Sequence, residues 1–130
     1  MSADNEKKPC CTLSDLMDMQ HALFEKHKHE WLPHAPESGR SYLLWSVEEL
    51  GEMIAIIKKK GDEAIVANPA VRAHFVEEAA DVLMYLMDTL DCYGITGEDL
   101  SAAYTAKFAR NMKRDWKENK TMYEDAPTEK

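Results

Sequence analysis

The apolar residues of this chain recur at intervals of three and four throughout, and no segment alternates polar with apolar residues long enough to predict a strand. This periodicity predicts an all-α fold. A length of 130 residues suffices for one domain with a core of its own and is too short for two. We therefore expect a single all-α domain over residues 1–130, with mobile tails at about 1–11 and 120–130.

Capping residues and helix breakers divide the chain into four predicted helices. The third begins after Asn68 and Pro69, a common N-cap and first-turn pair, and the second ends at Gly61 after a run of lysines. On such signals the helices span about 12–29, 41–60, 69–94 and 96–119. We expect them to form a four-helix bundle. Large apolar arcs on the second and third helices exceed what one protomer covers, so we also expect a homo-oligomer, either a dimer or a tetramer.

Charge and composition exclude several classes of protein. The net charge of −8 argues against a nucleic-acid-binding surface, which needs many contacts from Lys and Arg to phosphates. No apolar run is long enough to span a membrane, and the first residues lack the hydrophobic region of a signal peptide. The three cysteines form no paired framework, which is typical of a reducing compartment. These features predict a cytoplasmic protein without membrane or nucleic-acid partners.

The second predicted helix carries carboxylates on its apolar side. At about 100° per residue, Glu49 lies inside the stripe that includes Trp45 and Ile56, Glu52 lies at its margin, and Glu48 falls outside it. A carboxylate among apolar side chains is costly unless a cation, a metal ion or hydrogen bonds compensate its charge. The helix therefore has the pattern of one whose carboxylates bind a partner that compensates their charge.

The third predicted helix repeats this pattern. Glu78 lies beside the apolar face and Asp81 follows three residues later, while Glu77 and Asp88 extend the acidic strip outward. Antiparallel packing of the two helices would gather both acid pairs. Such a cluster cannot stay fully ionised without a cation, because like charges at close range raise one another's pKa. Oxygen ligands favour Mg²⁺, with Mn²⁺ as a possible substitute.

Both acid pairs also admit a simpler interpretation. The chain contains 24 acidic residues, so two acids three residues apart often occur by chance on a solvated helix face. The alternative function is a noncatalytic helical interaction module whose acidic strips are solvated or contact a partner's basic residues. Two pairs on consecutive helices, each beside apolar residues, favour the metal site. Binding of Mg²⁺ distinguishes the two hypotheses.

The fourth predicted helix is the most basic part of the chain. Tyr104, Lys107, Asn111 and Arg114 share one face at helical spacing, and six of the sixteen basic residues lie between positions 107 and 120. Taken alone, this face is either a solvated helix end or a site for an anionic ligand.

The order and spacing of these motifs resemble a known family. An ExxE pair, an interval of 25 residues, an ExxD pair and then "KFARNMKR" are similar to the MazG-like all-α nucleoside triphosphate pyrophosphohydrolases, which include all-α dUTPases and dCTP pyrophosphatases. The resemblance covers about residues 41–115, and "EELGE" and "EEAADVLMYL" match in flanking residues as well as in the acids.

This resemblance implies a function. It implies hydrolysis of a nucleoside triphosphate to the monophosphate and pyrophosphate, and it implies two sets of site residues. Cleaning of the nucleotide pool is a physiological role that would suit such an activity. The ion would be held by Glu49, Glu52, Glu78 and Asp81, and phosphate would contact Lys107, Asn111 and Arg114.

The same residues suit that chemistry on physical grounds. Attack of water on a polyphosphate requires neutralisation of oxygen charge and an aligned nucleophile, which metal ions and a carboxylate supply. Either Glu49 or Glu52 accepts the proton of the water, and their spacing does not decide between them. Trp45, one turn before Glu49, either stacks on a base or belongs to the core, and the core role is the more common one.

Other catalytic motifs are absent from the sequence. It contains no GxxxxGK[ST] loop, and "HEWLPH" has the wrong spacing for a zinc-binding HExxH. No Glu-x-x-His pair of the ferritin-like kind occurs. The histidines are interpreted as surface or hydrogen-bonded residues; they are His21, His27, His29, His34 and His74.

Overall fold

The structure is a computed structural model that describes residues 11–115. Its elements follow one another as α1 (Leu13–His27), a 3₁₀ turn η1 (Pro36–Ser38), α2 (Gly39–Lys60), α3 (Asp62–Ala67), α4 (Pro69–Cys92) and α5 (Gly97–Lys113). The described part of the chain contains no strand, which confirms the all-α prediction. Apart from Cys11, the expected mobile tails lie outside the described residues.

The helix starts follow the capping signals of the sequence. Thr12 and Thr96 each form a capping box with the aspartate three residues later. The Asn68 side chain accepts hydrogen bonds from the backbone amides of Ala70 and Val71, and Pro69 occupies the first position of α4. These side chains satisfy backbone donors that helix ends leave unpaired, so the predicted starts of α1, α4 and α5 hold within a residue or two.

The structure differs from the prediction in the connecting segments. α1 ends at His27, and α2 begins at Gly39 as a continuation of η1, slightly before the predicted start. α3 was not predicted, because a six-residue helix is too short to show a periodic apolar face. Gly61 turns the chain between α2 and α3 with a φ of +84°, a conformation that glycine adopts without strain.

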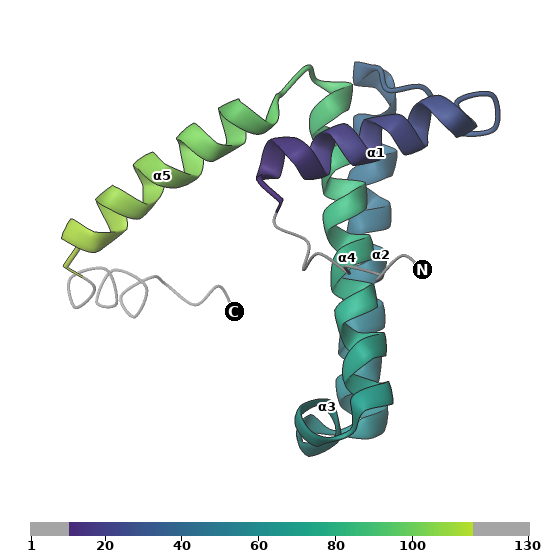
Figure 1. The fold of residues 1–130 in the computed structure, drawn as a ribbon, viewed down its shortest axis with the longest axis vertical. Helices are drawn as coiled ribbons and strands as arrows, with labels where there is room; N and C mark the ends of the chain where they lie inside the picture. The colour runs from purple at the N-terminus through teal and green to yellow at the C-terminus, as the bar shows by residue number, and fades with distance from the viewer. Residues whose placement is uncertain (1–10, 116–130) are drawn as a thin grey trace, which may run out of the picture.

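The long helices α2 and α4 form an antiparallel hairpin, and α3 caps the turn between them (Figure 1). α1 lies across the other end of the hairpin, and α5 leaves that end and points away from it. Among the described helices, α5 contacts α1 alone. The expected bundle is therefore not closed within one chain, because α5 does not return along the hairpin.

The core of the single chain is small for the number of apolar residues. The buried apolar side chains are Phe24, Tyr42, Ile56, Met87 and Cys92. Large exposed apolar side chains run along one side of α2 and along α5; they include Leu43, Val47, Leu50, Ile54, Tyr104, Phe108 and Met112. Exposed apolar surface of this extent is typical of a protein–protein interface. No helix in residues 11–115 has both the length and the apolar character needed to cross a bilayer.

Candidate active site

Three carboxylates from two helices converge on the inner side of the hairpin. Glu49 comes from α2, and Glu78 and Asp81 come from α4. All three side chains are half-buried, and each offers an oxygen within 4.8 Å of the others. The antiparallel packing of α2 on α4 produces this acid cluster, since it places the middle of one helix beside the middle of the other.

The acid cluster carries more negative charge than its surroundings compensate. A hydrogen bond with Glu78, together with burial and the nearby charges of Glu78 and Asp81, raises the pKa of Glu49 to about 7. Burial and the charge of Glu78 raise the pKa of Asp81 as well. His74 lies within 3.1 Å of Glu78, but within residues 11–115 no lysine or arginine forms an ion pair with the three carboxylates. The cluster is therefore suited to hold a proton or a cation.

The remaining acids of the two predicted pairs lie further out. Glu52 is exposed one turn after Glu49, and its charge contributes to the raised pKa of Glu49, so it lies near the cluster without joining it. Glu48 and Glu77 are exposed. The helical geometry thus separates Glu49 and Glu78, which face inward, from the acids immediately before them.

A cavity of about 560 Å³ opens beside the acid cluster. Glu49 and Asp81 belong to its lining, so the cavity and the acid cluster are continuous. Its aromatic walls are formed by Trp31, Tyr42, Trp45 and Tyr85, and its polar lining includes Gln20, Glu30, Glu48 and Asp88. A volume in this range, with apolar walls and a few polar groups, is typical of a small-molecule site.

Trp45 takes part in both the packing and the cavity. Its ring meets Tyr42 edge to face, with centroids 5.2 Å apart, and lies 5.9 Å from the ring of Tyr85. Tyr42 is fixed in turn by a 2.6 Å hydrogen bond that its hydroxyl donates to the carbonyl of Leu32. The half-buried indole is thus held by neighbouring rings while it lines the cavity. The two roles considered for Trp45 are compatible.

The basic face of α5 does not reach the acid cluster within one chain. Lys107, Asn111 and Arg114 lie on or directly after α5, which among the described helices contacts α1 only. Figure 1 shows α5 directed away from the hairpin that carries the acids. Of the residues expected at the site, the structure therefore gathers Glu49, Glu78 and Asp81 with Trp45 nearby, and places the α5 set apart.

The interpretation of Asp88 as an outward acid was wrong. Asp88 is 2% exposed, accepts hydrogen bonds from Gln20 at 3.1 Å and lies 2.9 Å from Nε2 of His34. Burial raises the pKa of Asp88, and the contacts with Gln20 and His34 oppose that shift. A signal was present in the sequence, because Asp88 follows Asp81 by seven residues, two helical turns on the same face.

The chain matches a known family. A family profile described as dATP/dGTP pyrophosphohydrolase matches residues 39–129, from the start of α2 to beyond α5. The matched region contains the acid cluster, Trp45 and the basic face of α5. Neither the comparison with curated proteins nor that with solved structures gives a match.

Proposed function

We propose a substrate and a cofactor from the premise that the chain belongs to the dATP/dGTP pyrophosphohydrolase family and is a nucleoside triphosphate pyrophosphohydrolase. The proposed substrates are purine deoxynucleoside triphosphates. The proposed cofactor is a divalent cation, Mg²⁺ or in its place Mn²⁺, held at the acid cluster. Removal of these nucleotides from the cytoplasmic pool is the cellular role that this activity suggests.

The acid cluster supports the cation. Its ligands are all carboxylate oxygens, which Mg²⁺ and Mn²⁺ prefer, and the raised pKa of Glu49 reflects a charge excess that a cation relieves. Glu49, Glu78 and Asp81 would hold the ion, with Glu52 as a fourth carboxylate one turn away. When bound, the ion neutralises charge on the phosphate oxygens and makes a bound water more acidic.

The reaction breaks the anhydride between the α- and β-phosphates. The oxygen of water forms a bond to phosphorus, the electron pair of the broken bond leaves with the departing phosphate oxygen, and the proton of water passes to a carboxylate. Glu49 and Glu52 are the candidates for that carboxylate. Glu49 lines the cavity at its acid end, and Glu52 lies one helical turn after Glu49. Little covalent help is required from the protein, so its main contributions are positioning and charge.

The continuity between the aromatic cavity and the acid cluster is the observation that carries the proposal. A triphosphate at Glu49 and Asp81 leaves its base inside the aromatic walls, where Trp45 offers a face for stacking. Glu30 and Glu48 are exposed residues of the same cavity lining and offer acceptors for the edge of a base. These features, with family membership, favour the hydrolase over the noncatalytic interaction module.

The remaining requirement is positive charge near the phosphates of the substrate. In this proposal, a second copy of the chain supplies it. α5 presents Lys107 and Asn111 together with an exposed apolar stripe that includes Tyr104, which is 72% exposed. We propose that homo-oligomerisation buries this stripe and brings the basic face of α5 to an acid cluster. Light scattering tests the assembly, and a 14.9 kDa monomer at micromolar concentration would contradict it.

A pyrophosphate-release assay over the common ribo- and deoxynucleoside triphosphates tests the function. With Mg²⁺ present, we expect dATP and dGTP to be hydrolysed with kcat/KM at least about 10-fold above dCTP and dTTP, because larger bases cover more of the aromatic walls. Chelation by EDTA is expected to abolish release. Equal rates for purines and pyrimidines would contradict the substrate, and full activity in EDTA would contradict the cation.

A further inference from the structure

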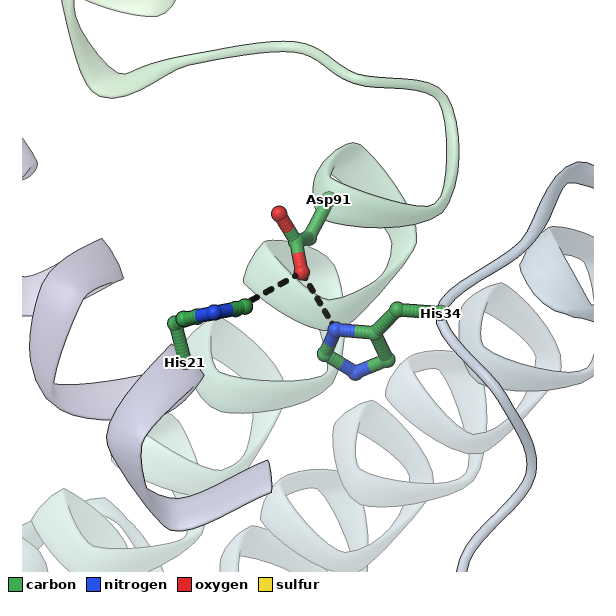
Figure 2. Close-up of side chains that lie close together, drawn as sticks. All are labelled: His21, His34 and Asp91. Atoms are coloured by element: carbon green, nitrogen blue, oxygen red, sulfur yellow. Dashed lines mark hydrogen bonds and ion pairs between the residues drawn. The ribbon is translucent and has the colours of Figure 1, made fainter. Parts of the chain in front are cut away.

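A second group of metal-ligand side chains lies at the end of α4 where α1 crosses the hairpin. His21 comes from α1, His34 from the loop between α1 and η1, and Asp91 from the last turn of α4. Their ligand atoms lie within 4.8 Å of one another. Figure 2 shows the two imidazole rings approaching the Asp91 carboxylate from two sides. Three segments distant in sequence therefore contribute one side chain each.

Both rings present Nδ1 to the same carboxylate oxygen of Asp91. Nδ1 of His21 lies 3.2 Å from Oδ2 of Asp91, and Nδ1 of His34 contacts the same oxygen. The opposite nitrogen of each ring meets another carboxylate: Nε2 of His34 lies 2.9 Å from Asp88, and Nε2 of His21 lies 3.7 Å from Glu25. A carboxylate near the far nitrogen is common for histidine ligands of metal ions, although neither of these two pairs has hydrogen-bond geometry in this structure.

His34 is held rigidly in this arrangement. Its side chain is 5% exposed, and its ring stacks on Phe24 with centroids 3.6 Å apart. Asp88, which meets its Nε2, is itself held by Gln20. The position of Nδ1 is thus set by packing before any ion binds, which lowers the cost of binding.

The other two ligands leave the group accessible. The side chains of His21 and Asp91 are 54% and 35% exposed. Both line a cavity of about 300 Å³, whose lining also contains Asp18 and Glu98. An ion can therefore enter from solvent, and water or a further carboxylate can complete its coordination.

We propose that His21, His34 and Asp91 form a binding site for a first-row transition-metal dication, best matched by Zn²⁺. Two imidazole nitrogens and one carboxylate oxygen suit Zn²⁺, whereas Mg²⁺ prefers oxygen ligands alone. Ligand atoms about 2.0 to 2.2 Å from one ion lie roughly 3 to 3.5 Å apart in tetrahedral geometry, and the 3.2 Å between His21 and Asp91 fits that range. The ion replaces the direct contact of His34 with Asp91.

The site has a structural consequence that is independent of the proposed substrate and of the acid cluster. It joins α1 to α4 through the loop that carries His34, so a bound ion fastens α1 against the hairpin. α1 supplies Gln20 and Leu23 to the large cavity. Zn²⁺ is therefore expected to raise the melting temperature of the chain and to restrain one wall of that cavity.

Isothermal titration of the full chain with Zn²⁺ tests the proposal. The protein is first stripped with a chelator and then held in millimolar Mg²⁺, so that the acid cluster does not compete for Zn²⁺. Replacement of Cys10 and Cys11 by serine in every sample removes adjacent thiols that bind Zn²⁺ by themselves. In this background we expect one Zn²⁺ per chain at the histidine site.

The variants separate the proposed ligands from histidine in general. His21→Ala and Asp91→Asn alter side chains that are partly exposed and are expected to fold, whereas His34 is packed in the interior. Both are expected to weaken Zn²⁺ binding at least about 100-fold and to remove the Zn²⁺-induced rise in melting temperature. His29→Ala is the matched control, because His29 is exposed and lies outside the group, and it is expected to bind as the parent does.

A spectroscopic readout identifies the donor atoms. Co²⁺ in a site with imidazole ligands and low coordination number absorbs in the visible range more strongly than Co²⁺ bound by water and carboxylates. We expect this absorption in the parent and in His29→Ala, and its loss in His21→Ala. Unchanged Zn²⁺ affinity in either His21→Ala or Asp91→Asn would overturn the proposal, as would the absence of Zn²⁺ binding by the parent at 100-fold molar excess.

Discussion

α4 carries two acidic regions that differ in how their charge is compensated. In the middle of the helix, Glu78 and Asp81 face Glu49 of α2, and the pKa of Glu49 is raised to about 7. His74 contacts Glu78, but within residues 11–115 no lysine or arginine pairs with the three acids. Packing alone does not favour such an arrangement, which indicates a role outside the fold itself.

Near the C-terminal end of the same helix, the acids are matched by donors. Asp88 accepts from Gln20 and lies against His34, and Asp91 meets His34 and His21. Here the carboxylates hold α1 and the loop before η1 in place. The comparison teaches that an aspartate on α4 supports the fold in one region and opposes it in the other, depending on whether its partners are donors or further acids.

The largest expected effect separates inward acids from their neighbours. Glu49→Gln and Glu78→Gln keep the shape of the side chain and remove its charge, so each is expected to lower kcat/KM at saturating Mg²⁺ by at least about 100-fold. Pyrophosphate release measures the loss.

The preceding residues serve as matched controls for this prediction. Glu48 and Glu77 are exposed and lie outside the acid cluster. Glu77→Gln is expected to keep kcat/KM within about 3-fold of the parent. Glu48 lines the cavity, so Glu48→Gln is expected to keep kcat within about 3-fold while KM changes. Equal losses in all four variants would show that the metal-facing sides of α2 and α4 have been assigned wrongly.

Alanine substitution of an aspartate is expected to destabilise the protein in one region of α4 and not in the other. Asp88→Ala leaves the amide of Gln20 without its buried acceptor and removes the carboxylate 2.9 Å from His34, so we expect the free energy of unfolding to fall by about 2 to 3 kcal/mol. Asp81→Ala relieves repulsion in the ion-free acid cluster and is expected to leave it unchanged or higher. Urea unfolding in EDTA gives both values. A loss of similar size in both variants would remove the distinction drawn between the two regions.

The contribution of the aromatic cavity to nucleotide binding can be tested at Trp45. Trp45→Ala removes a stacking surface next to Glu49, and we expect KM for the preferred nucleotide to rise about 10-fold, corresponding to about 1.4 kcal/mol. Val76→Ala on α4 is a suitable control, because Val76 is exposed and lies outside the cavity lining. An unchanged KM with a lowered melting temperature would assign Trp45 to packing alone.

The smallest expected effect is a pH dependence of the ion-free protein. The pKa of Glu49 rises from 4.5 to about 7 on folding, so the folded state resists ionisation and the free energy of unfolding falls as pH rises through that interval. The full shift corresponds to about 3 kcal/mol, and we expect about 1 kcal/mol after screening by solvent. Urea unfolding in EDTA at pH 5 and pH 8 measures the fall, and Glu49→Gln is expected to reduce it. An equal fall of the unfolding free energy between pH 5 and pH 8 in the parent and in Glu49→Gln would contradict the assignment of this pH dependence to Glu49.

Much of the fold follows from local signals in the sequence. Capping residues such as Thr12 and Asn68 satisfy backbone donors within a few residues, so they set helix starts without reference to the rest of the chain. α3 escaped prediction because six residues show no period. The direction of α5 was not predictable from the sequence either. An amphipathic pattern indicates that one face of a helix is buried, but it does not indicate which element covers that face.

The two acidic regions of α4 also differ in how far the sequence alone predicts them. The acid cluster was accessible from sequence because Glu49, Glu78 and Asp81 repeat at helical spacing beside apolar residues. The contacts of Asp88 with Gln20 and His34 span 68 and 54 positions, and no periodicity links residues so far apart on different elements. The exposed position of Glu52 depends on the exact rotation of α2 against α4, which spacing fixes only approximately.

Thermal unfolding with and without Mg²⁺, for the parent and Glu49→Gln at pH 8, tests the central claim that the acid cluster is an uncompensated cation site. Without ion, Glu49→Gln is expected to melt about 3 °C higher than the parent, because one repulsive charge is removed. Millimolar Mg²⁺ is expected to raise the melting temperature of the parent by several degrees and to leave that of Glu49→Gln nearly unchanged. A parent that does not respond to Mg²⁺, or a variant that responds equally, would contradict the claim.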